Sequence, residues 1–97
     1  MRVEIKDSNK DDKRFVAIFY DGDKKIKTTH FGLKNPKIGT YIDHKDKSIK
    51  FAWIARHEVK GNFKDFMTAS SLSYHILWNK PTLQASIKDY KKKFNLD

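Results

Sequence analysis

The stretch "RFVAIFYDGDKKIKTTHF" (residues 14–31) decides the fold of this chain. Residues 14–20 are rich in β-branched and aromatic side chains, which favour a strand. The Asp-Gly pair that follows is typical of a hairpin turn. Residues 25–31 then alternate between the two faces of a second strand, with Phe31 on the face opposite His30. The stretch therefore predicts an antiparallel β-hairpin.

A third strand is predicted on the N-terminal side of this hairpin. The sequence "RVEIK" (residues 2–6) alternates between apolar and polar side chains, and residues 8–13 form a polar turn. The first third of the chain is therefore expected to be a β-meander of three antiparallel strands. Residues 32–39, which contain two glycines and a proline, predict a loop.

From Ile42 the apolar period changes from that of a strand to that of a helix. Large apolar side chains recur on two faces of the segment that runs to Val59: Ile49 and Trp53 on one face, Phe51 on the other. A helix with two apolar faces is usually enclosed. We therefore expect a central helix between the sheet and the C-terminal helices.

A further helix of about two turns is predicted over residues 70–78. Ser70 or Ser71 is expected to cap its N-terminus. Pro81 disfavours helical geometry in the residue before it, so the helix should end at Asn79, a residue that tolerates the left-handed conformation.

The last helix is predicted to begin with Pro81 in its first turn or with Thr82 as its cap. Its apolar residues recur at i, i+4, i+7 and i+11 and form one narrow stripe: Leu83, Ile87, Tyr90 and Phe94. Ser86 points away from this stripe, together with Asp89 and Lys93. The helix is therefore expected to complete the core.

These elements predict an α+β fold. An N-terminal three-stranded antiparallel β-meander (residues 1–31) is followed by about three helices packed on it (residues 41–97). A chain of 97 residues is expected to form a single domain, residues 1–97, with one modest core.

Charge is the strongest global signal in the sequence. The chain holds 21 Lys and Arg against 12 Asp and Glu, a formal net charge of +9. Arginine occurs only at Arg2, Arg14 and Arg56, so lysine dominates, which favours non-specific attraction to phosphate over the reading of base edges. An AT-rich coding sequence also tends to produce a lysine excess, and that excess then has no functional cause.

The composition also excludes several classes of site. The absence of cysteine excludes disulfides, thiolate metal sites and cysteine catalysis. No apolar run approaches the roughly 20 residues that cross a bilayer, and the N-terminus lacks an apolar signal core. We therefore expect a protein that is neither transmembrane nor secreted.

Candidate nucleic-acid contacts follow from the basic residues. Arg56 is the best single candidate because a guanidinium chelates a phosphate. The other candidates are Lys80, Lys88, Lys91 and Lys92. The lysines near the C-terminus also fit a solvated helix end that complements the helix dipole. A continuous polyanion site would further require a lysine of the first third on the same side: Lys24, Lys25, Lys27, Lys34 or Lys37.

Four histidines invite a metal or catalytic hypothesis: His30, His44, His57 and His75. None forms a helical i, i+4 pair with another, and no known metal-ligand motif is present. His44 and Asp46 form an H-x-D pair that converges only in irregular backbone. We therefore expect no catalytic residue, no metal site and no cofactor.

The aromatic residues divide into two groups. Trp53 and Trp78 would stack on bases, but each lies on an apolar helical face, which favours burial. Phe63 and Phe66 lie in the polar connection 60–70 and are better candidates for exposed aromatic residues, because loops position ligands more often than core faces do.

Four motifs occur together in the chain: "THFG" (residues 29–32), "TYIDHKD" (40–46), "WIARH" (53–57) and "ILWNKPTLQASIKDYKKKF" (76–94). By these motifs the chain resembles a small family of unknown function that is encoded by large DNA viruses of algae and amoebae and by some phage-like genomes. The family usually has an "AGFWSRW" pattern where this chain has "ASSLSYH", and Asp-Tyr-Thr where it has Gly39-Thr40-Tyr41. The resemblance implies a viral origin and no particular activity.

Three functions remain open. The first is a non-enzymatic viral protein, in the virion or in the host cytoplasm or viral factory, that binds nucleic acid mainly through phosphates. The second is a structural or cement protein of the minor capsid type, which docks on other viral proteins through residues 63–67 or a sheet edge. The third is a small metal-dependent nuclease or hydrolase that uses His44, Asp46 and His57. A homo-oligomer is compatible with each.

Overall fold

The computed structural model describes residues 1–34, 39–58 and 63–97. Three strands form one antiparallel sheet of order β1-β2-β3: β1 (Arg2–Asp7), β2 (Lys13–Asp21) and β3 (Lys24–Leu33). The helical elements that follow are α1 (Tyr41–His44), α2 (Lys47–Glu58), α3 (Ala69–Leu72), the π-helix η1 (Ser73–Leu77) and α4 (Leu83–Lys93). The predicted α+β fold, with a β-meander before the helices, is confirmed.

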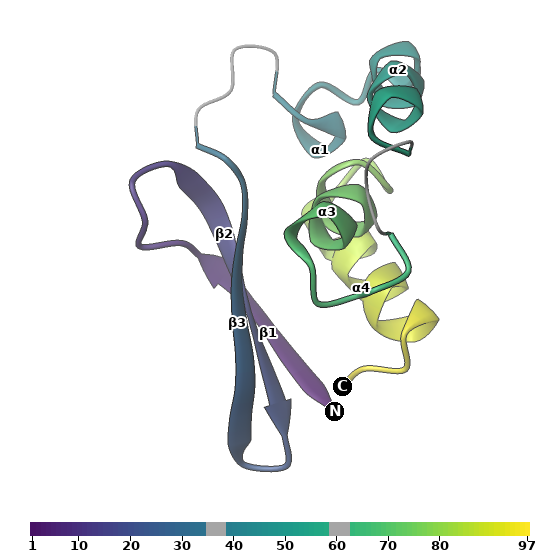
Figure 1. Cartoon of the computed structure of the whole chain (residues 1–97). Coiled ribbons are helices and arrows are strands. Elements are labelled where there is room, and N and C mark those ends of the chain that lie inside the picture. Colours follow the sequence, from purple (N-terminus) through teal and green to yellow (C-terminus); the bar gives the residue numbers. More distant parts are fainter. Residues whose placement is uncertain (35–38, 59–62) are drawn as a thin grey trace.

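The helices cover one face of the sheet (Figure 1). Strand β2 is central, and its residues Phe15, Ala17 and Phe19 point toward the helices and are buried. Phe31 of β3 lies opposite Phe15, with ring centroids 5.9 Å apart. Gly22 turns the hairpin with φ of +62°, a conformation that glycine adopts without strain, as the Asp-Gly pair predicts.

The core joins this sheet face to the C-terminal half of the chain. Leu72, Ile76 and Leu77 are almost completely buried, as is Tyr90 of α4. The phenol of Tyr90 donates a hydrogen bond to the carbonyl oxygen of Phe66. The apolar stripe predicted for the last helix therefore faces the core.

The predicted continuous helix from Ile42 is wrong, because the chain forms two helices there. Lys45 adopts the left-handed conformation, with φ of 58°, and ends α1. Asp46 then starts α2, because its carboxylate accepts hydrogen bonds from the backbone N–H groups of Ser48 and Ile49. A local cap thus outweighs the helical periodicity of the segment.

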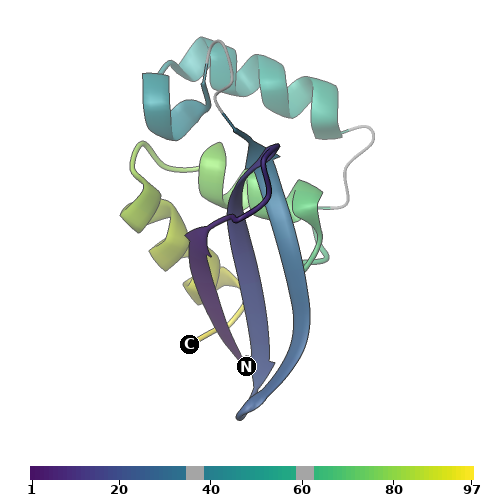
Figure 2. The same ribbon diagram turned by 90° about the vertical axis from the view of Figure 1, so that its left-hand side faces the viewer.

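Helix α2 is also not enclosed as predicted. It lies across one end of the sheet, at the end away from the two termini (Figure 2). Ile49 and Trp53 are half-buried against the body of the protein, whereas Phe51 on the opposite face is 61% exposed. The predicted end of this helix at Val59 lies outside the described residues.

The segment from α3 to α4 departs from prediction in two details and follows it in a third. Thr68, rather than Ser70 or Ser71, caps α3, and its hydroxyl accepts from the Ser71 N–H. Asn79 is not left-handed; its side-chain amide instead donates to Asp89 at 2.6 Å. Thr82 caps α4, as one of the two alternatives predicts, with the Ala85 N–H as donor.

Ser86 is fully buried, although the helical pattern places it away from the apolar stripe. Its hydroxyl accepts a hydrogen bond from the Lys80 N–H at 3.0 Å and donates one to the Lys80 carbonyl at 3.3 Å. The corner folds back over this side of α4. A serine satisfies the backbone there without leaving an unpaired polar group.

The two chain ends meet beside β1 (Figures 1 and 2). The Val3 N–H donates to the Asp97 carbonyl at 3.1 Å, and the Asp97 N–H donates to the Met1 carbonyl at 2.9 Å. These bonds cover part of the β1 edge. In the described residues no helix is long and apolar enough to cross a membrane.

Candidate nucleic-acid interface

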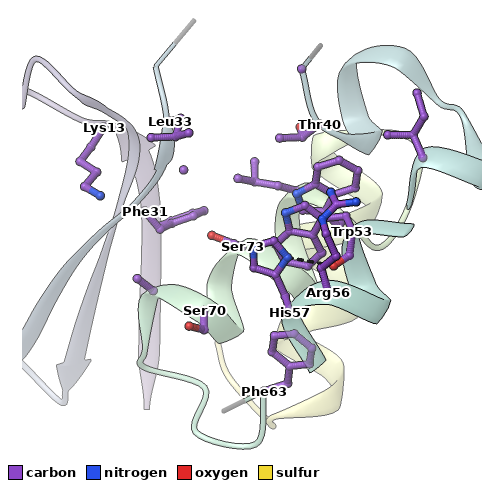
Figure 3. Close-up of a pocket in the computed structure, with 16 residues that line it drawn as sticks. Lys13, Phe31, Leu33, Thr40, Trp53, Arg56, His57, Phe63, Ser70 and Ser73 are labelled. Carbon is purple, nitrogen blue, oxygen red and sulfur yellow. Dashed lines mark hydrogen bonds between the residues drawn. The ribbon is translucent and has the colours of Figure 1, made fainter. Parts of the chain in front are cut away.

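A cleft of about 450 Å³ opens between β3, α2 and the segment that contains α3 and η1. Phe31 and Leu33 line it on the sheet side, and Trp53, Arg56 and His57 line it from α2 (Figure 3). The other lining residues are Lys13, Gly32, Gly39, Thr40, Ile49, Phe63, Ala69, Ser70, Ser73, Leu77 and Trp78. Segments far apart in the sequence therefore form one recess.

Aromatic rings with nearly parallel planes form much of the cleft wall. The ring of Trp53 stacks on His57, at a centroid distance of 4.1 Å, and on Trp78, at 4.9 Å. The planes of Trp53 and Phe63 are 12° from parallel, and Phe63 itself stacks on Tyr74. Trp53 and Phe63 are half-buried, and both line the cleft.

The cleft is positively charged. Arg56 and Lys13 are its charged lining residues, and no aspartate or glutamate lines it within the described part of the chain. Arg56 is exposed and forms no ion pair with a described carboxylate. Ser70 and Ser73 add hydroxyl groups that hydrogen-bond to no other described side chain or backbone group. The recess thus combines apolar faces, free hydroxyls and cations.

Glycine makes the close contact at the sheet side possible. Gly32 has φ of +80°, and a Cβ placed on it would lie 2.9 Å from Leu77 Cδ1. The π-helix η1 brings Ser73 and Leu77 toward this position. π-helical turns often occur at functional sites, because they change which side chains face a neighbour.

Two contacts hold the helices around the cleft. The Thr40 N–H and hydroxyl donate to the Asp43 carboxylate, which also receives the Arg14 guanidinium of β2. Lys50 of α2 donates to the Asn79 carbonyl at 2.7 Å and lies 4.7 Å from the Tyr41 ring centroid. Burial, followed by the charges of Lys80 and Lys47, lowers the pKa of the Lys50 ammonium.

The predicted phosphate contacts fall into three places. Arg56 lines the cleft. Lys80 lies near Lys50, close enough for its charge to lower the Lys50 pKa. The remaining three are on α4: Lys88, Lys91 and Lys92.

Lys91 lies apart from the cleft, beside Val3 and Ile5 in a shallow groove between α4 and β1. The sequence analysis did not single out Lys13, which lines the cleft, or Lys47 and Lys50 of α2. Lys47 and Lys50 are one turn apart, which is a signal that the sequence does contain. Of the lysines expected in the first third, Lys37 lies outside the described residues.

The histidines do not assemble a metal site. Among residues 1–34, 39–58 and 63–97 no group of three or more His, Cys, Asp or Glu side chains is placed to hold a metal ion. His44 and Asp46 do lie together, since the Asp46 N–H donates to His44 Nδ1 at 2.9 Å. His57 instead donates from Nδ1 to the Trp53 carbonyl at 2.9 Å.

The predicted aromatic roles are partly reversed. Trp78 is buried, at 6% exposure, as expected. Phe66 is half-buried and packs on Phe19 and Phe94, so it is part of the core rather than an exposed loop residue. Phe63 remains a candidate for ligand contact because it lines the cleft.

A family of unknown function (DUF5754) matches residues 3–57, which include almost all of the sheet, α1 and most of α2. The segment "ILWNKPTLQASIKDYKKKF" (76–94) lies outside the matched residues. No curated protein and no solved structure matches the chain.

Proposed function

The chain belongs to the family of unknown function DUF5754, and we propose that it is a small, basic, non-enzymatic protein that binds nucleic acid mainly through phosphates. The main observation behind this proposal is that the candidate basic side chains have no ion-pair partner among the described carboxylates. The five candidate residues form no ion pair with any described carboxylate: Arg56, Lys80, Lys88, Lys91 and Lys92. Their charges are therefore available to a polyanion.

The net charge supports the same function. At +9 the folded chain repels itself, and a polyanion relieves that repulsion while releasing its own counterions. Lysine, which predominates, attracts phosphate without reading bases. Binding should therefore depend steeply on salt and little on sequence.

We place the protein in a virus, either in the virion or in the infected cell. The motifs of the sequence, above all "LWNKPTL" (residues 77–83), support this origin. The test is a search for the protein in purified virions and in infected cells, with an antibody raised against it. Its absence from both would contradict the viral role.

The binding test compares two variants with equal charge loss in different elements of the fold. The first neutralises α4 with Lys88→Gln, Lys91→Gln and Lys92→Gln. The matched control neutralises the β2–β3 hairpin with Lys24→Gln, Lys25→Gln and Lys27→Gln. We expect the α4 variant alone to lower the slope of log affinity against log salt, by about 1 for each lost phosphate contact.

The titration uses a duplex at low salt and is repeated as salt is raised. If no duplex binding occurs at low salt, or if binding is indifferent to salt, phosphate binding is wrong. An equal effect of both variants would show attraction to total charge and would contradict the assignment to α4.

A second candidate is a structural protein that docks on other viral proteins. The position of β3 as an edge strand favours it, since Leu33 and Ile26 on that strand are exposed. Lysines on the same strand disfavour pairing with another strand. Stoichiometric recovery of the protein in viral shells stripped of DNA would favour this function over the first.

A further inference from the structure

The cleft beside Arg56 has features that phosphate attraction alone does not require. We propose that it holds an unstacked base of a single-stranded nucleic acid, with Arg56 on an adjoining phosphate. This inference rests on the proposed nucleic-acid binding and specifies which form of nucleic acid is bound and where.

The aromatic geometry supports a planar occupant. The planes of Trp53, Phe63 and Trp78 share one orientation, with angles of 12° between Trp53 and Phe63 and 11° between Trp53 and Trp78. His57 and Trp78 already stack on Trp53, so a flat group that enters parallel to these planes would extend this stack from its outer rings. Every base offers such a face, so stacking is tolerant of sequence.

The charge and the hydroxyl groups of the cleft favour a planar ligand that has a polar edge and carries an anionic group. Arg56 attracts an anion, and no described carboxylate lines the cleft to repel it. The hydroxyls of Ser70 and Ser73 both donate and accept hydrogen bonds, so they suit the polar edge of any base. A nucleotide meets both requirements, because it contains a flat polar base and a phosphate.

The size of the cleft suits one nucleotide rather than a helix. A volume of about 450 Å³ lies in the range of small-ligand sites, about 300 to 1,000 Å³. A base inside a duplex is stacked and paired, and it cannot reach a recessed wall without being extruded. A single strand presents its bases without that cost, so it should be preferred.

The two tryptophans provide a direct reporter of occupancy. Trp53 and Trp78 are the only tryptophans of the chain, and both line the cleft. The experiment titrates the protein, at low salt, with an oligothymidylate of about ten nucleotides and with a hairpin duplex of equal phosphate number. Affinity is measured by anisotropy of a fluorescein label, and cleft occupancy by tryptophan fluorescence.

We expect the oligothymidylate to bind at least about fivefold more tightly than the duplex and to quench tryptophan fluorescence, because stacking adds to phosphate contact. The duplex should bind without this quenching. Equal affinities for both probes, with no quenching by either, would overturn the cleft assignment and leave phosphate binding intact. Failure of both probes to bind at low salt would overturn both.

Two variants test the cleft itself. Ala69→Leu places a larger apolar side chain at an exposed position of the cleft wall without changing charge, and Phe63→Leu removes a ring face. Each should lower oligothymidylate affinity about fivefold or more and leave duplex affinity unchanged. Ala52→Leu, on the exposed side of α2 and outside the cleft, is the matched control and should change neither.

Thermal melts establish that each variant is folded before its affinity is compared. Loss of oligothymidylate and duplex binding in equal proportion, in a folded Ala69→Leu protein, would overturn the cleft assignment. So would quenching by thymidine 5′-monophosphate at an affinity equal to that of the oligonucleotide, since the site would then take a free nucleotide rather than a strand.

Discussion

Arg14 forms a bidentate ion pair with the Asp43 carboxylate, with Nη1 2.7 Å from Oδ2 and Nη2 2.8 Å from Oδ1. The pair joins the sheet to the first helix, because Arg14 is on β2 and Asp43 is on α1. The same carboxylate receives the N–H and the hydroxyl of Thr40, which lines the cleft. This bidentate contact thus holds Thr40 in the cleft wall and fixes α1, the helix that leads into α2.

Asp43→Asn should lower the free energy of unfolding at neutral pH. It should also reduce the loss of that free energy as the pH falls. The hydrogen bonds from Arg14, together with those from Thr40, hold the pKa of the Asp43 carboxyl well below its usual range. Such a group stabilises the fold above its unfolded pKa, near 3.9, and loses this contribution as pH falls toward its folded pKa. Both side chains are partly exposed, so we expect a loss of about 1 kcal/mol at neutral pH.

Urea denaturation at pH 7 and at about pH 3 checks this expectation. The exposed Asp23, in the β2–β3 turn, supplies the control Asp23→Asn. A variant at Asp43 that matched this control at both pH values would show that the ion pair contributes nothing to stability.

Gly32→Ala should destabilise the protein more than Gly22→Ala does. Both glycines have positive φ, so each alanine carries a backbone strain of about 1 kcal/mol. At Gly32 the new methyl group would also lie 2.9 Å from Leu77 Cδ1, whereas nothing lies within 4 Å at Gly22. We expect overpacking to add about 1 to 3 kcal/mol at Gly32 alone. Thermal unfolding of the two variants measures the difference in stability. Equal losses of stability would mean that the side chains around Gly32 rearrange to accommodate the methyl group.

Ser86→Ala should weaken the corner between η1 and α4. The buried Ser86 hydroxyl binds both the N–H and the carbonyl of Lys80, so its removal leaves these groups without that partner. We expect a loss of about 1 to 2 kcal/mol in the free energy of unfolding. Ser70→Ala, at an exposed position, is the control and should lose little. Faster amide exchange at Lys80 would locate the effect; an unchanged rate would contradict it.

His75→Gln should reduce the loss of stability between neutral and mildly acidic pH. His75 donates from Nε2 to the Phe63 carbonyl, and its Nδ1 is buried with no hydrogen-bond partner among the described residues. Burial lowers its pKa, and the neighbouring charge of Lys93 acts in the same direction. The unfolded chain therefore binds more protons as pH falls from about 6.5 toward the folded pKa, and stability declines over that window.

The measurement is the urea midpoint at about pH 7 and about pH 5. Glutamine keeps a donor for Phe63 but does not titrate, so the variant should show a smaller difference between the two midpoints. The natural sequence, measured at the same two pH values, is the reference. An unchanged difference in the His75 variant would assign the acid sensitivity to other groups.

The sequence by itself determined the sheet and the last helix. Alternation over residues 14–20, the Asp-Gly turn and the stripe of α4 are local patterns, and local patterns suffice where one face of an element meets one core. The fold class followed from them because the strands precede the helices in a chain too short for a second core.

Only the tertiary structure decided how α2 lies and what it encloses. Asp46 caps a new helix where periodicity predicts a continuous one, and Lys50 then anchors α2 through the distant carbonyl of Asn79. The cleft brings together Phe31, Trp53 and Ser73 from three segments, with Gly32 allowing the close approach of Leu77. Such convergence depends on long-range contacts that no periodicity encodes, so the sequence supplied the rings and cations while the fold alone placed them around one recess.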